Sequence, residues 1–142
     1  MLATYVERAP LEVLRVRTDL RANGPAKAFA LLESKLPTRR GRKFYGTFRI
    51  TSEGEEYYAC VVRAESDDPG AMGLETGTIP GGWYARRTLL DWESHLPEIH
   101  RIFLEMIRVE NVDPSRPSVE FYRSRRELQL LLPVMRTTEP SI

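Results

Sequence analysis

The segment VEFYR, residues 119–123, places a carboxylate and a phenol two positions apart. Side chains two positions apart in a β-strand point to the same face, so Glu120 and Tyr122 are expected side by side. A carboxylate withdrawn from water needs a partner, and a bound organic cation would be one. An arginine of the chain is the alternative partner. Glu120 is therefore the first candidate for a ligand contact, with Tyr122 beside it.

Aromatic residues elsewhere in the chain are candidates for the walls of such a site. Flat aromatic rings suit planar or quaternary ammonium ligands through stacking and cation–π attraction. The candidates besides Tyr122 are Phe48, Trp92 and Tyr58. We expect them as ligand contacts, and ordinary core packing is the alternative for each of them.

Other reactive residue types give little support for catalysis or metal binding. The single cysteine, Cys60, lies in an apolar run and is expected to be an inert buried thiol. His95 and His100 are five positions apart, off the spacing that places two metal ligands on one helix face. No serine–histidine–aspartate or cysteine–histidine pattern supports a nucleophile. We expect no metal and no cofactor.

Length and composition limit the class of protein. The chain has 142 residues, 42% of them hydrophobic, and a formal net charge of +1. This favours a single domain, residues 1–142, and gives no electrostatic case for direct binding to nucleic acid. No apolar run is long enough to cross a membrane, and no apolar leader is visible near Met1. A cytoplasmic location is expected.

The elements that must position these residues follow from apolar periodicity and from turn residues. One helix is expected over 26–36, and another from a cap at Asp91 or Ser94 to about residue 109. Six strands are expected, at residues 12–18, 44–50, 57–63, 83–89, 119–124 and 127–134. Each half of the chain is therefore predicted to contain a strand, a helix and two further strands, in that order.

The two halves also match each other in sequence. Arg17-Thr18 matches Arg87-Thr88 at a separation of 70 residues, and the segment 45–49 aligns with 119–123 at 74, which makes Phe48 the equivalent of Tyr122. This indicates two tandem repeats, about 3–66 and 74–135, followed by a tail at 136–142. The predicted fold is α+β, with pseudo-twofold symmetry and a curved, mostly antiparallel sheet. We expect two helices on one face and a ligand cleft on the other.

Three segments resemble one known family. They are TIPGGWYA at 78–85, PSVEFY at 117–122 and LQLLLPV at 128–134. In their order and spacing they are similar to the GyrI-like small-molecule-binding domains, over about residues 3–135. That family includes effector-binding domains of multidrug-sensing transcription regulators, a gyrase-inhibitory protein and hydrolases of cyclopropanoid toxins.

The resemblance implies a stand-alone binding domain with a cleft for a hydrophobic, aromatic or cationic ligand. The family's glutamate maps onto Glu120. A second glutamate, common on the closing strand, is replaced here by Gln129, which we include among the expected ligand contacts. Without that second carboxylate we expect a binding protein rather than an enzyme.

Two alternatives belong to other functional classes. The first is a hydrolase of strained electrophiles, in which Glu120 orients water and Tyr122 assists. The second is a protein-interaction module that acts on a regulator or on gyrase through its surface, with Arg39, Arg40 and Arg42 as contacts. Each of these three functions is compatible with an oligomeric protein.

Overall fold

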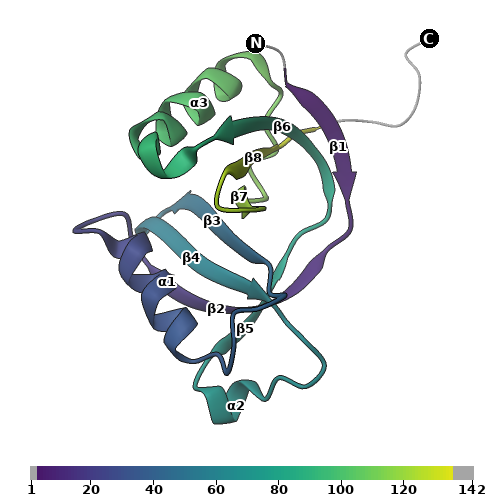
Figure 1. The fold of residues 1–142 in the computed structure, drawn as a ribbon. Helices are drawn as coiled ribbons and strands as arrows, with labels where there is room; N and C mark the ends of the chain where they lie inside the picture. The colour runs from purple at the N-terminus through teal and green to yellow at the C-terminus, as the bar shows by residue number, and fades with distance from the viewer. Residues whose placement is uncertain (1–2, 136–142) are drawn as a thin grey trace.

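The computed structural model describes residues 3–135, so the expected tail at 136–142 lies outside the described residues. These residues form a single curved sheet of eight strands with helices packed against it (Figure 1). The strands are β1 (Thr4–Arg8), β2 (Leu11–Thr18), β3 (Phe44–Thr51), β4 (Gly54–Val62), β5 (Glu75–Ile79), β6 (Gly82–Leu90), β7 (Ser118–Tyr122) and β8 (Glu127–Pro133). The helices are α1 (Gly24–Ser34), α2 (Pro69–Met72), the 3-10 turn η1 (Trp92–Ser94) and α3 (Leu96–Val109). None of these helices is long and apolar enough to span a membrane.

The order of the strands shows a pseudo-twofold relation between the two halves of the chain. The order is β1-β6-β8-β7-β3-β4-β2-β5, so β7 and β3 form the central pair and equivalent strands follow outward on each side. All the pairings are antiparallel. The α+β class and the curved antiparallel sheet predicted from the sequence are confirmed.

Two strands that the periodicity did not predict form the edges of the sheet. β1, with the sequence TYVER, pairs with β6 of the second half, and β5, with the sequence ETGTI, pairs with β2 of the first half. Each half therefore lends its first strand to the other. Edge strands are held by one row of backbone hydrogen bonds and are largely exposed, so they carry little apolar alternation for sequence analysis to detect.

Each long helix buries residues that are spaced four positions apart. In α1 these are Gly24, Ala28 and Leu32, and Ala28 and Leu32 pack on β2 and β4. In α3 they are Ile102 and Met106, which pack on β8. The same helix face is therefore used in both halves, as expected of a duplicated unit.

Both long helices cover the same face of the sheet, and this face carries Tyr122. Directly paired residues share a face, and the pairs Leu14–Val61, Val61–Phe44, Phe44–Tyr122 and Tyr122–Leu128 run across the sheet in sequence. The helix α1 covers the Leu14 end of this row, and α3 covers the Leu128 end. Figure 1 shows the two helices on that side.

The position of Glu120 relative to the helices therefore differs from the expectation. Glu120 and Tyr122 share a face, as predicted, but it is the face that the helices cover. Val119 and Phe121 point instead into a second apolar cluster with Tyr45 and Leu131 on the opposite face. Because both faces of β7 meet apolar neighbours, the alternation of residues could not assign the helix side.

The packing of α3 gives a test of the fold. Met106 is 2% exposed beneath α3, so we expect Met106→Ala to lower the free energy of unfolding by about 2–5 kcal/mol through loss of packing and cavity formation. Urea denaturation measures this change. Val109→Ala is the control, because Val109 is 79% exposed on the same helix and its truncation should change little. Equal effects of the two substitutions would contradict the packing of α3.

Candidate functional site

A cleft of about 730 Å3 opens between α1, the start of α3 and the central strands. Its lining combines apolar residues from both helices with polar residues at its edges. The lining residues are Leu20, Asn23, Pro25, Ala26, Phe29, Glu33, Arg42, Phe44, Trp92, Leu96, Tyr122, Arg123, Ser124 and Arg125. The cleft therefore lies where the two repeats meet, on the helix-covered face.

The ring of Tyr122 is the centre of an aromatic group in this cleft. Phe29 of α1 meets it edge-on with ring centroids 5.2 Å apart, and Trp92 meets it edge-on at 5.0 Å. The indole of Trp92 is itself fixed, since its Nε1 donates a hydrogen bond of 3.0 Å to the carbonyl of Ser124. The two repeats thus contribute one aromatic wall each, with Tyr122 between them.

Behind Tyr122 lies the carboxyl group of Glu120, held by two phenols. The hydroxyl of Tyr57 donates to Oε1 of Glu120 at 2.5 Å, and the hydroxyl of Tyr122 donates to the same oxygen at 2.7 Å. The other oxygen, Oε2, accepts no hydrogen bond from residues 3–135, and no basic side chain in this range forms an ion pair with Glu120. The carboxyl group is therefore oriented but has no protein cation as its partner.

The electrostatics of this group follow from its burial. Burial raises the pKa of Glu120 above its ordinary value, and the hydrogen bonds from Tyr57 and Tyr122 lower it only in part. Burial also raises the pKa of each of these tyrosines well above the usual range, and the charge of Glu120 adds to this. The two phenols therefore remain protonated and act as donors to the carboxylate.

A glycine makes room for this arrangement on the neighbouring strand. Gly46 of β3 is paired directly with Glu120 of β7. A Cβ atom at Gly46 would collide with the hydroxyl of Tyr57 and would stand 2.5 Å from Oε1 of Glu120. Any larger residue would thus displace the carboxylate or its donor.

Of the six residues expected at the site, the structure brings three together: Glu120, Tyr122 and Trp92. Phe48 lies on the same face, two positions beyond Gly46 on β3, and is not part of the cleft lining. Tyr58 faces the opposite side of the sheet, next to Arg15. Tyr57 and Phe29 also belong to this group, and neither was predicted from the sequence.

Gln129 also lies on the face away from Glu120. It is paired with Phe121 across β7 and β8, and its side chain donates a hydrogen bond of 3.0 Å to Glu127. A carboxylate at position 129 would therefore point away from the cleft. The role that the resemblance implied for this position, as a partner of Glu120, is not available in this structure.

The charged residues at the cleft edge are mostly engaged within the protein. Arg42 is tied to both carboxylate oxygens of Asp67, at 3.1 and 2.7 Å, and its side chain is only 12% exposed. Glu33 pairs with Arg39 at 3.2 Å. Arg42 therefore anchors its loop, and its side chain offers little surface for the protein partner considered above.

The remaining reactive residue types lie elsewhere. Cys60 is buried, and burial raises the pKa of its thiol to about 12, as expected for an unreactive thiol. His95 and His100 are exposed. Within residues 3–135, no cluster of three histidine, cysteine or acidic side chains is arranged to hold a metal ion.

Comparison with known proteins finds similar structures but no matching sequence. No family model matches the chain, and no curated protein matches its sequence. An integron cassette protein from Vibrio cholerae superposes with a TM-score of 0.69 at 16% identity, covering 94% of this chain and 96% of that one. The protein SAV2435 bound to tetraphenylphosphonium superposes with a TM-score of 0.63 at 13% identity, covering 95% and 94%.

A hydrolase from Listeria innocua also shares the fold. Its TM-score is 0.57 at 12% identity, and the superposition covers 94% of this chain and 92% of that one. At such identities the similarity establishes the fold, and the site must be judged on its own side chains.

The two phenols define a test of the carboxyl group. We expect Tyr122→Phe to raise the pKa of Glu120, because the lost hydrogen bond favours the charged form. An NMR titration of the Glu120 side-chain carboxyl carbon measures this shift. Tyr58→Phe is the matched control, since it removes the same hydroxyl on the opposite face and should leave the titration unchanged. A lowered or constant pKa in Tyr122→Phe would contradict the geometry.

Proposed function

We propose that this chain is a GyrI-like binding module whose cleft takes a hydrophobic organic cation that carries aromatic groups. The observation that supports this most directly is the carboxylate of Glu120. It is partly buried behind Tyr122, which lines the aromatic cleft, it is held by two phenols, and it has no ion pair with any basic residue from 3 to 135. A ligand cation would supply the missing partner.

The balance of energies favours a large, weakly hydrated cation over a small one. A partly buried carboxylate without a cation partner carries a desolvation cost, and hydrogen bonds from neutral phenols offset only part of that cost. A delocalised cation loses little hydration when it enters an apolar cleft, whereas an ammonium ion loses much more. The rings of Tyr122, Trp92 and Phe29 add apolar contact and cation–π attraction.

The dimensions of the cleft agree with such a ligand. A volume of about 730 Å3 lies within the range of pockets that hold drug-sized molecules. The binding of tetraphenylphosphonium by SAV2435, a protein with the same fold, supports this class of ligand. Tetraphenylphosphonium therefore serves as a probe of the cleft and is not proposed as its natural ligand.

Binding is a better proposal than hydrolysis for this arrangement. General acid–base hydrolysis commonly uses two groups whose pKa values are held apart. Here the described residues that contact Glu120 through hydrogen bonds are both tyrosines with raised pKa values. The site is therefore better suited to hold a charge than to move a proton.

The proposal predicts that tetraphenylphosphonium binds and that Glu120→Gln weakens this binding about tenfold or more, because the countercharge is lost. Isothermal titration calorimetry measures the affinity. Binding to the wild type should strengthen as pH rises through the raised pKa of Glu120, and the variant should lack this dependence. The matched control is Glu93→Gln, which removes an equal charge from an exposed residue that, unlike Glu120, has no hydrogen bond to Tyr122 of the cleft lining.

A neutral analogue separates charge from shape. Triphenylphosphine oxide offers similar aromatic surface without the positive charge, so it should bind more weakly and respond little to Glu120→Gln. Equal affinities for the two compounds, together with no effect of Glu120→Gln in a variant that melts normally, would contradict the proposal.

A further inference from the structure

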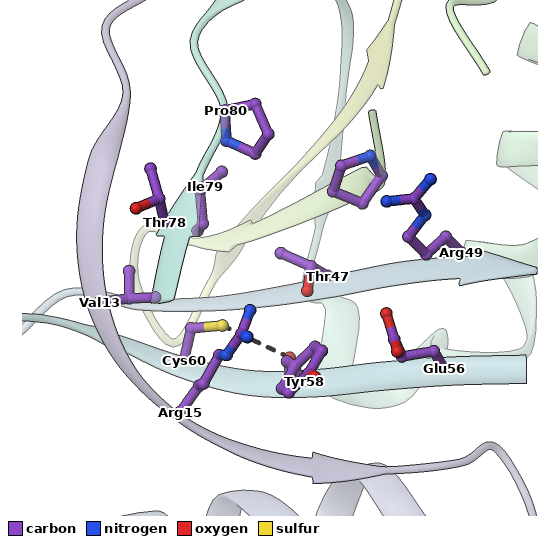
Figure 2. Close-up of a pocket in the computed structure, with 11 residues that line it drawn as sticks. Val13, Arg15, Thr47, Arg49, Glu56, Tyr58, Cys60, Thr78, Ile79 and Pro80 are labelled. Atoms are coloured by element: carbon purple, nitrogen blue, oxygen red, sulfur yellow. Dashed lines mark hydrogen bonds between the residues drawn. The ribbon is translucent and has the colours of Figure 1, made fainter. Parts of the chain in front are cut away.

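A second, smaller pocket lies on the opposite face of the sheet. It has a volume of about 110 Å3 and is shown in Figure 2. Two arginines, Arg15 and Arg49, enter it from β2 and β3. The other lining residues are Val13, Thr47, Glu56, Tyr58, Cys60, Thr78, Ile79, Pro80 and Pro117. Nothing in the proposed function above uses this pocket.

The guanidinium of Arg15 is fixed from three directions. It lies over the ring of Tyr58, with Cζ 3.8 Å from the ring centroid. Its Nε donates a hydrogen bond of 2.5 Å to Glu75. On another side it lies against Gly77 of the edge strand, where a Cβ atom would come within 2.6 Å of Cζ. This guanidinium is therefore held in place before any ligand binds.

The held guanidinium retains unused donors. Within residues 3–135, neither Nη1 nor Nη2 of Arg15 has a hydrogen-bond acceptor. Arg49 likewise forms no ion pair or hydrogen bond in this part of the chain. Figure 2 shows the two arginines on either side of Thr47, whose side chain is almost fully buried between them. Two arginines from neighbouring parts of the sheet thus line one small space.

The charged residues that line the pocket are Arg15, Arg49 and Glu56, and they sum to one positive charge. Glu75 compensates Arg15 through the bond described above, and Arg17 compensates Glu56 at 3.4 Å. Arg49 has no such counterpart among the residues that the structure describes. One negative charge on a ligand would restore the balance, and a planar carboxylate matches the fork of an arginine.

The remaining lining residues indicate which chemical group of the ligand accompanies its negative charge. Ile79 and Pro80 present apolar surface at the side of the pocket away from the Tyr58 ring (Figure 2), and Pro117 also lines the pocket. We propose that this pocket binds a short-chain aliphatic carboxylate. The carboxylate accepts hydrogen bonds from Nη of Arg15 and from Arg49, and the alkyl group contacts Ile79 and the prolines.

The test is an NMR titration with propionate at constant ionic strength, in which chloride is replaced. The readouts are the Nε–Hε signals of the arginines and the backbone amides of Thr47 and Cys60. We expect saturable shifts in the wild type. Arg49→Gln should weaken binding about tenfold, because one charged donor is lost. Arg49 is exposed, so this variant should fold normally.

The controls make the result decisive. Arg108→Gln removes an equal charge from the exposed surface of α3 and should bind propionate as the wild type does. Gly77→Ala should also reduce binding, since the added methyl group displaces the guanidinium of Arg15. Shifts that grow linearly, or equal binding by Arg49→Gln and the wild type, would overturn the proposal. Phosphate that binds as tightly as propionate would overturn the role of the apolar wall.

The proposal for this pocket and the proposal for the cleft can be tested independently. Arg49→Gln should leave the affinity for tetraphenylphosphonium unchanged, because Arg49 lies on the other face of the sheet. Loss of binding to both ligands in this variant would indicate damage to the fold and would overturn the assignment of a separate site.

Discussion

The antiparallel pairing of β3 with β7 is the interaction on which the rest of the structure depends. It joins the two halves of the sheet, and it places Glu120 opposite Gly46 at the centre of the molecule. Since a glycine leaves space there, the carboxyl group and the hydroxyl of Tyr57 can occupy it together. The halves cannot separate without exposing this central pair, and the exchange of β1 and β5 between them adds a second constraint.

This central pairing also explains why the cleft is lined from both repeats. The helices α1 and α3 pack on equivalent strands at either side of the pair, and the space between them stays open above Tyr122. Each half contributes an aromatic wall, and neither half alone surrounds Glu120. A duplicated unit thus provides a binding site at its own axis, while the single carboxylate breaks the symmetry of that site because its equivalent position is a glycine.

The sheet uses its two faces differently. One face holds the helices and the apolar cleft with its acidic group. The other holds a second apolar cluster around Tyr45 and, beside it, the arginine-lined pocket. The same fold occurs in proteins described as a cassette protein, a protein that binds tetraphenylphosphonium and a hydrolase. Since the scaffold is shared among them, the chemistry of this chain must be sought in its own side chains.

The sequence by itself determined the α+β class, six of the eight strands, both long helices, and the placement of Glu120 beside Tyr122. These features depend on local periodicity, which fixes how neighbouring side chains are oriented relative to one another. Only the tertiary structure decided that the helices cover the face of β7 that carries Glu120 and Tyr122. It also decided that Tyr57 and not Tyr58 reaches Glu120, and that Gln129 points away from Glu120. The physical reason is that alternation along a strand defines two faces but does not say what covers either one, and here both faces of the central strands are buried.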